Sequence, residues 1–200
     1  MKKILVLVCL ICAAVGVNAQ EHHCGKCKHQ KPAIESPVLD CIMTRTSIRQ
    51  YLDRKVSCDT VEVLLRAGMA APTAVNKQPW HFVVVTNRDL LEALGGRSKD
   101  APLAIVVCGD TNNMLEGGGR DYWIQDCSAA SENILLAAHA LGLGAVWQGG
   151  YPSERRVEDI KKVLQLPENL IPMSTIAIGY PNEAPAPKDK WNPEKITFKK

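Results

Sequence analysis

Apolar positions along the chain follow two patterns, one typical of buried strands and the other of amphipathic helices. Continuous apolar, β-branched runs predict four strands, at 80–86, 101–108, 145–148 and 173–179. Helical periodicity predicts five helices, at 39–43, 59–70, 88–94, 123–141 and 154–164. Tight hairpin signals do not separate these elements, so the pattern predicts an α+β fold with helices packed around a central sheet.

Two of the predicted helices carry further signals. Ser57 or Asp59 can cap the start of the helix at 59–70. The helix at 123–141 is the longest, and its alanines and serines allow another helix to approach closely. We therefore expect this helix at a central or interface position.

The first residues have the features of an export signal rather than of the fold. Lys2 and Lys3 precede an apolar run at 4–17, and Val17 and Ala19 are small residues of the kind a signal peptidase requires. The run is too short for a stable membrane span, although a retained N-terminal anchor is the alternative. We expect a signal peptide at 1–19, a flexible polar lead-in at 20–37 and one domain at 38–200, exported to a bacterial periplasm.

Composition and charge narrow the class of protein. The 200 residues are 46% hydrophobic and 22% charged, values typical of a single globular domain. Loss of residues 1–19 would lower the net charge from +3 to about +1. The sequence has no basic run, so it offers no electrostatic reason to expect nucleic acid as a partner.

The cysteines fall into two groups. Cys24 and Cys27 stand in the lead-in at CxxC spacing, where they could form a disulfide in an oxidising compartment. Together with His29 they are alternatively candidates for a soft-metal site. Cys108 ends a predicted strand and Cys127 opens the long helix, so we expect both to be buried thiols.

Candidate chemistry begins at the segment RTSIR. Arg45 and Arg49 offer forked guanidinium donors, and Thr46 and Ser47 offer hydroxyl groups between them. Guanidinium and hydroxyl donors together suit a phosphate monoester. Taken alone, the motif is also consistent with solvated surface arginines.

Two further segments could accommodate a flat ligand. The loop at 71–80, APTAVNKQPW, presents Thr73, Asn76 and Gln78 between a predicted helix and a predicted strand. At 147–150, the sequence WQGG follows a strand, and paired glycines let the backbone approach a planar ring. Lysines of the C-terminal tail would add positive charge, although such a run is usually only solvated.

In this order and at this spacing, the motifs resemble those of the nitroreductase family of FMN enzymes. The resemblance covers about 39–196 and lies in RTSIR, AAPTAVNKQPWHFVVV, DCSAASENILLAAHALGLGAVW and IAIGYPNEAP. It implies a mixed sheet of four or five strands wrapped by helices. It also implies an intertwined homodimer with two flavins at the subunit interface.

The resemblance further implies which residues bind FMN. Those expected at its phosphate and ribityl chain are Arg45, Thr46 (through its backbone), Ser47, Arg49 and Lys190, with Lys188 as an alternative to Lys190. Those expected along the ring are Pro72, Thr73, Ala74 and Asn76 from the other subunit, and Gln148, Gly149 and Gly150 with a backbone N–H near N5.

Members of this family pass a hydride from NAD(P)H to flavin N5 and then to a nitroaromatic, quinone or similar acceptor, in a ping-pong mechanism. The cofactor carries the chemistry, so no side chain is assigned as general acid or base, and His81 and His139 are expected to be structural. The stretch at 110–122 is short, which predicts an open acceptor site. Export leaves the donor open between NAD(P)H and a redox partner or quinol.

Two alternatives remain at this point. A specialised family reaction, such as reductive dehalogenation or flavin destruction, would need added lid residues that the sequence does not display. A non-enzymatic carrier of flavin or metal is favoured by the export signal and the cysteine–histidine lead-in. Reduction of the bound flavin, followed by turnover, would separate an enzyme from a carrier.

Overall fold

The computed structural model describes residues 35–199. The expected signal peptide and nearly all of the lead-in lie outside the described residues, as do Cys24, Cys27 and His29. The export signal, the disulfide and the metal site therefore stay predictions.

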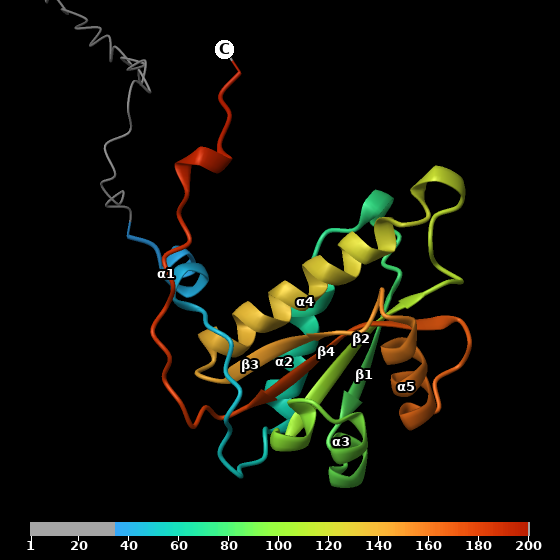
Figure 1. The fold of residues 1–200 in the computed structure, drawn as a ribbon, viewed down its shortest axis with the longest axis horizontal. Helices are drawn as coiled ribbons and strands as arrows, with labels where there is room; N and C mark the ends of the chain where they lie inside the picture. Colours follow the sequence, from blue (N-terminus) through green and yellow to red (C-terminus); the bar gives the residue numbers. More distant parts are fainter. Residues whose placement is uncertain (1–34, 200) are drawn as a thin grey trace, which may run out of the picture. The chain divides into compact units, whose positions relative to one another are not determined.

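A four-stranded sheet forms the centre of the described domain (Figure 1). Its strands are β1 (Trp80–Val85), β2 (Leu103–Asp110), β3 (Gly144–Gly149) and β4 (Leu170–Gly179), in the order β1-β2-β4-β3. All three ladders are antiparallel, which corrects the expectation of a mixed sheet. The reason is that β4 inserts between β2 and β3, two strands that run in the same direction. Parallel pairing among the described residues is confined to an isolated bridge between Ser47 and Ala145.

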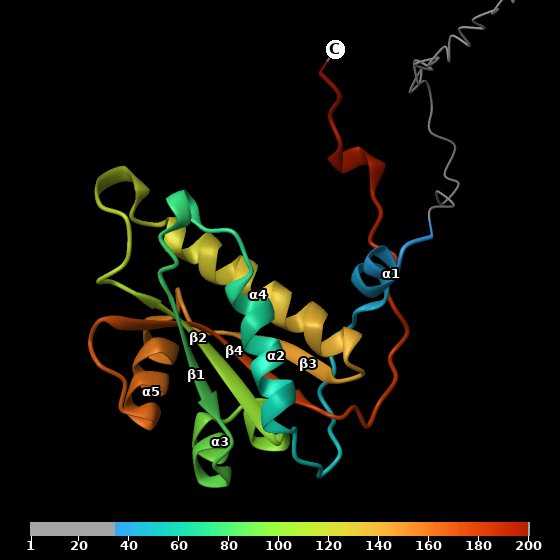
Figure 2. The same cartoon turned by 180° about the vertical axis from the view of Figure 1, so that it is seen from behind.

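Helices cover both faces of this sheet. The described residues form α1 (Pro37–Thr44), α2 (Cys58–Met69), α3 (Arg88–Leu94), α4 (Tyr122–Ala140) and α5 (Glu154–Leu164). Helices α2 and α4 cross on one face, whereas α3 and α5 lie on the other (Figure 2). The alpha+beta prediction is thus confirmed, and the predicted bounds of α3 and α5 match the structure.

Strand β2 contributes to two hydrophobic cores, one on each face of the sheet. Alternate residues of a strand point to opposite faces. Leu103, Ile105 and Val107 contribute to the core under α2 and α4. The residues between them, Ala104, Val106 and Cys108, contribute to the core under α3 and α5. Because both faces are covered, β2 is apolar along nearly its whole length.

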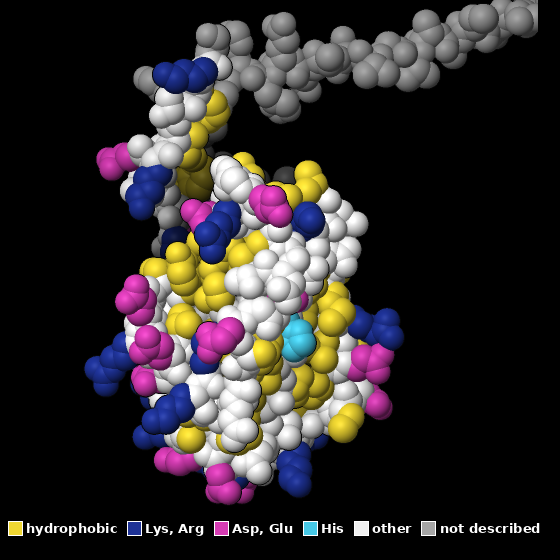
Figure 3. Space-filling view, turned by 90° about the vertical axis from the view of Figure 1, so that its right-hand side faces the viewer, with side chains coloured by type: hydrophobic (Ala, Val, Ile, Leu, Met, Phe, Trp, Pro, Cys, Tyr) yellow, Lys and Arg dark blue, Asp and Glu magenta, His cyan; other side chains and the backbone are white. Residues whose placement is uncertain are grey.

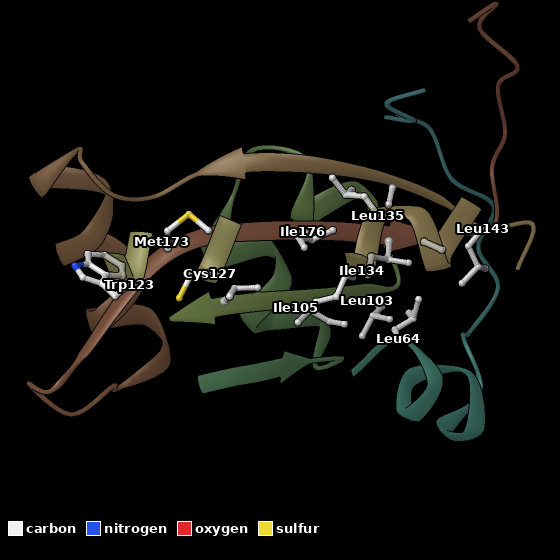
Figure 4. Packing of buried hydrophobic residues seen from close by; sticks show 14 of the residues in the cluster. Leu64, Leu103, Ile105, Trp123, Cys127, Ile134, Leu135, Leu143, Met173 and Ile176 are labelled. Carbon is white, nitrogen blue, oxygen red and sulfur yellow. The ribbon is translucent and has the colours of Figure 1, made fainter. Parts of the chain in front are cut away.

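The larger core lies between the sheet and α4. In Figure 4, Leu64 and Ile134 pack beside Leu103 near one end of the sheet, while Trp123 and Met173 close the other end. Leu64, Leu103 and Ile134 are at most 1% exposed. This packing fixes α4 across the sheet and with it every segment that α4 contacts.

The two cysteines predicted to be buried thiols are fully buried and free. Burial raises the pKa of the Cys108 thiol to about 12 and also raises that of Cys127. Both side chains are therefore neutral at physiological pH and serve as small apolar groups.

Capping side chains set the helix boundaries. Ser57 accepts a hydrogen bond from the Thr60 N–H at 3.2 Å, so Ser57 rather than Asp59 caps α2. Asn87 caps α3 and Ser153 caps α5 in the same way. Within 35–199, no helix is both long and apolar enough to cross a bilayer.

The surface on the side of α5 mixes both charges. Figure 3 shows lysine or arginine side chains interspersed with acidic ones, and hydrophobic patches between them. This side of the described domain therefore offers no broad surface of a single charge.

Candidate functional site

The segment that carries the two candidate arginines leaves α1 and lies along the β3 edge of the sheet. The Ile48 N–H donates to the Ala145 carbonyl at 3.0 Å, next to the parallel bridge of Ser47. Ile48 is buried, and its side chain fills the space over Gly144, where an added Cβ would lie 2.5 Å from Ile48 Cγ2. The backbone of this segment is thus fixed at the start of β3.

Tyr51 ties the same segment to the next strand. Its hydroxyl lies 2.6 Å from the Ile48 carbonyl and 3.1 Å from the Ala177 carbonyl of β4. Burial raises the pKa of Tyr51 well above its ordinary value. Charges around the hydroxyl act in both directions on this pKa: Glu183 and Asp100 raise it, and Arg49 and Arg97 lower it.

The two arginine side chains have different surroundings. Arg45 is directed toward α4, with Nε 3.4 Å from a Glu132 carboxylate oxygen and 19% of the side chain exposed. Arg49 is exposed, and its Nη1 donates to the Ser47 carbonyl at 3.2 Å. Thr46 and Ser47 between them are half-buried. Arg45, Thr46, Ser47 and Arg49 thus share one short segment of the chain, although the two guanidinium groups have different partners.

The loop after α2 meets the beginning of α4. The Ala74 N–H donates to the buried Asp126 carboxylate at 2.9 Å. Val75 and Asn76 have positive φ values of 44° and 57°, which residues with side chains seldom adopt and which often mark functional loops. A hollow of about 570 Å³ opens beside this loop, and its lining comprises Pro72, Thr73, Ala74, Val75, Leu115, Tyr122, Gln125, Asp126 and Ala129.

The end of β3 holds a third group of candidates. The Gln148 side chain accepts from the Arg97 N–H at 2.6 Å and donates to Ser98 Oγ at 3.0 Å. At Gly149 an added Cβ would meet no atom within 4 Å, so the backbone there is open to a ligand. At Gly150 an added Cβ would lie 2.5 Å from the Pro172 carbonyl. Packing against β4, rather than access for a ligand, accounts for the second glycine.

The structure does not bring all candidates together within one chain. Ser47 and Gly149 lie beside opposite ends of β3, and the 72–76 loop lies at the start of α4. Lys190 is exposed in the extended tail, and the described residues offer its side chain no hydrogen bond or ion pair. The tail leaves the end of β4 and extends away from the sheet (Figure 1).

Sequence reasoning missed three polar groups that hold these segments. Arg97 and Ser98 position Gln148, and Glu183 bonds to the backbone at Arg49. A sequence signal existed for the first two, because the adjacent glycines Gly95 and Gly96 predict a tight turn, and both have positive φ in the structure. Glu183 stands within the motif IAIGYPNEAP, but its contact with Arg49 spans 134 residues, so no local pattern predicts that pairing.

Comparison with known proteins defines the class to which this fold and site belong. The nitroreductase family matches this chain over 42–101 and 95–180. The protein therefore belongs to the nitroreductase family.

Individual relatives are similar over most of their length. A Methanothermobacter thermautotrophicus protein provisionally named NADH dehydrogenase/NAD(P)H nitroreductase is 49% identical over 169 residues, which are 82% of this chain and 87% of the relative. A Parabacteroides distasonis structure with the same provisional name has a TM-score of 0.77 and 41% identity, over 82% of this chain and 98% of that one. A Desulfovibrio desulfuricans structure, provisionally named a nitroreductase and solved in complex with FMN, has a TM-score of 0.72 and 31% identity, over 84% and 99% of the two chains.

Proposed function

We propose that this protein is an exported, FMN-dependent oxidoreductase that takes electrons from NAD(P)H and passes them to small acceptors such as nitroaromatics or quinones. The observation that carries the proposal is the donor segment 45–49, held against the β3 edge of a nitroreductase-family sheet. The names of relatives support the donor, and the FMN complex of a similar structure supports the cofactor.

The donor set fits the phosphate end of FMN. Two guanidinium groups and a hydroxyl supply charge and directed donors for a phosphate dianion. Arg45 is held by Glu132 and by burial, so less side-chain freedom is lost when it binds. We assign Arg45, Ser47 and Arg49 to the phosphate and ribityl chain, with the Thr46 backbone beside them.

The open backbone at Gly149 fits the flat end of the same cofactor. A ring could approach the end of β3 there, where Gln148 is fixed by Arg97 and Ser98. We assign Gln148 and Gly149 to the ring, whereas Gly150 supports this backbone by packing against β4 and donating its N–H to the Met173 carbonyl. When bound, FMN supplies the ring that accepts and releases a hydride, while the protein positions the two substrates in turn.

A second copy of the chain would complete the site. We propose that Pro72, Thr73, Ala74 and Asn76 line the flavin of the other subunit, because within one chain they lie apart from the 45–49 segment. Exposed apolar side chains support such an interface, among them Met43 at 62% exposure and Phe198 at 68%. In this homodimer we place Lys190 at the phosphate.

The acceptor site is proposed to be open. The stretch between β2 and α4 contains a single 3-10 turn, Gly117–Gly119, and no longer helix.

Export would put the enzyme where NAD(P)H is scarce, so a redox partner or quinol is the second candidate donor. A measured intact mass that matches a chain beginning at Gln20 would support cleavage of the signal peptide. A mass that matches a chain retaining Met1 would contradict it.

The decisive measurement is an absorbance spectrum of the purified protein, recorded without oxygen before and after the addition of NADH or NADPH. Flavin bands that bleach, and that return when a quinone is added, are expected. Flavin bands that persist with every donor would contradict the enzyme and favour a flavin carrier. A protein that takes up no FMN would contradict the cofactor assignment itself.

Arginine variants test the assignment of the phosphate segment. Arg45→Ala and Arg49→Ala should each weaken FMN binding by about tenfold or more, and riboflavin binding by much less, because riboflavin lacks the phosphate. Arg155→Ala is the matched control, since its side chain is 92% exposed on α5. Full FMN occupancy in both site variants would contradict the assignment.

A further inference from the structure

A carboxylate from the tail after β4 lies against the candidate phosphate segment. Glu183 Oε1 accepts a hydrogen bond from the backbone N–H of Arg49 and another, at 3.1 Å, from that of Gln50. Both hydrogen bonds end on the same oxygen atom. The Glu183 side chain is half-buried, so its position is set by the protein rather than by solvent.

Backbone pairing on either side fixes the place of this carboxylate. The Asn182 N–H donates to the Gln50 carbonyl at 2.9 Å, and Pro181 forms an antiparallel bridge with Tyr51. The tail and the arginine segment therefore run together as a short extension of the sheet. Glu183 lies at the end of this extension, where its side chain contacts the backbone of Arg49.

A negative charge is unexpected beside arginines that would bind a dianion. Coulomb repulsion between the carboxylate and a phosphate disfavours binding. The compensating effect is geometric, because two successive backbone N–H groups form a small anion-binding concavity that the carboxylate fills. Their bonds fix the backbone at Arg49, whose side chain then turns back toward Ser47.

We propose that Glu183 is a positioning residue for the phosphate end of the cofactor site. Its carboxylate holds the Arg49 and Gln50 N–H groups so that the Ser47 hydroxyl and the Arg49 guanidinium are presented together. This inference rests on the proposed function, because it takes the 45–49 segment as the phosphate site. Charge and geometry predict opposite effects of removing the carboxylate, so the two roles can be separated.

Three variants of the full mature chain would test the role, with FMN and riboflavin affinities measured by the quenching of flavin fluorescence. Glu183→Ala removes the acceptor, and we expect FMN affinity to fall about tenfold and riboflavin affinity by less than about twofold. Glu183→Gln keeps an Oε1 acceptor for both N–H groups and should retain FMN affinity within about threefold of the wild type. Glu158→Ala removes an exposed acid on α5 and is the matched control.

Each other outcome counts against the inference. If the alanine and glutamine variants both bind FMN as tightly as the wild type or more tightly, the carboxylate acts only as a repelling charge. If Glu183→Ala weakens FMN and riboflavin binding equally, its role is to maintain the fold, which a lower melting temperature would show separately. A wild-type protein that fails to prefer FMN to riboflavin overturns the proposed function as well. Arginine-dependent FMN binding that is unchanged in Glu183→Ala overturns this inference alone.

Discussion

Single side chains decide how closely β2 and α4 approach each other. Gly109 lies near the end of β2, and Trp123 of α4 packs directly over it. An added Cβ would overlap the indole ring and would also lie 2.8 Å from Met114 Cε. Such a contact cannot be relieved by one flexible side chain, because the indole is itself 5% exposed and packed on all sides.

Gly109→Ala is therefore expected to destabilise the protein by about 1–3 kcal/mol, as overpacked cores generally do. Urea denaturation, monitored by tryptophan fluorescence, would measure this loss of stability. Gly118→Ala is the control, because no atom lies within 4 Å of its added Cβ and the expected change is at most about 0.5 kcal/mol. Equal stability of the two variants would contradict the packing described for Trp123.

Tyr51 links the arginine segment to β4 through its hydroxyl, so Tyr51→Phe should cost about 1–2 kcal/mol at pH 7. Burial raises the pKa of this hydroxyl, so the folded protein holds the proton more tightly than the unfolded chain does. The stabilisation is fully present below the unfolded pKa of about 10 and is lost as the pH rises above it. Urea titrations at pH 7 and above pH 10 would measure the free energy of unfolding of the wild type and of Tyr51→Phe. The difference between these two free energies should be smaller at the higher pH. A difference that stays constant would contradict the buried, protonated hydroxyl.

At the scale of elements, α4 is the helix from which the candidate site is positioned. Asp126 holds the 72–76 loop, and Glu132 holds Arg45 two turns later. Near its C-terminus, Leu136 accepts from the Cys41 thiol of α1, and His139 lies 2.9 Å from Thr44 Oγ1. Because α4 is anchored over the sheet by its buried face, these contacts place two distant loops relative to one core.

Asp126→Ala should release the 72–76 loop from α4. The Ala74 N–H would lose its acceptor in a part-buried position, at a cost of about 1–3 kcal/mol. Hydrogen exchange at residues 74–78 should become faster, while exchange in β2 should not. Asp126→Asn keeps an acceptor for the Ala74 N–H and should change hydrogen exchange less. Gln125→Ala is the control, because Gln125 is the exposed neighbour of Asp126 and lines the same hollow. Unchanged exchange in Asp126→Ala would show that the loop is held by other contacts.

How far the sequence predicts these elements depends on how local their causes are. Helices α3 and α5 follow from nearby caps and periodicity, and the structure confirms their predicted bounds. Strand order does not follow, because β4 inserts between β2 and β3 through pairings such as Val106 with Thr175. No pattern within a short window specifies a partner about 70 residues away.

The same reasoning applies to the candidate site. The contiguous segment RTSIR was recognisable because its donor types stand within five residues of one another. The Gln148 contact with Arg97 and the Glu183 contact with Arg49 join residues that are 51 and 134 positions apart. The sequence therefore indicates candidate binding side chains more readily than it indicates the side chains that hold their segments in place.

At the scale of the whole molecule, the described chain exposes apolar groups that a monomer would not be expected to leave in solvent. Helix α1 has no buried residue, yet Val38, Ile42 and Met43 are apolar. The tail adds Trp191 at 63% exposure and Phe198 at 68%. Surfaces of this kind usually mark contacts with another chain. A second copy is the partner that the proposed function requires, because it would also supply the loop that lines the flavin.

We therefore expect the protein to sediment as a dimer in analytical ultracentrifugation. Replacing both Ile42 and Met43 with Glu would place two charges in a buried apolar contact, which should shift the protein strongly toward monomer. Leu90→Glu alters a comparably apolar residue, 37% exposed on α3, and should leave the dimer intact. If the flavin loop comes from the other subunit, FMN occupancy should fall in parallel with the dimer and recover at high protein concentration. A monomeric wild type that binds FMN fully would contradict the shared site, and a dimeric double variant without FMN would place α1 at the cofactor rather than at the interface.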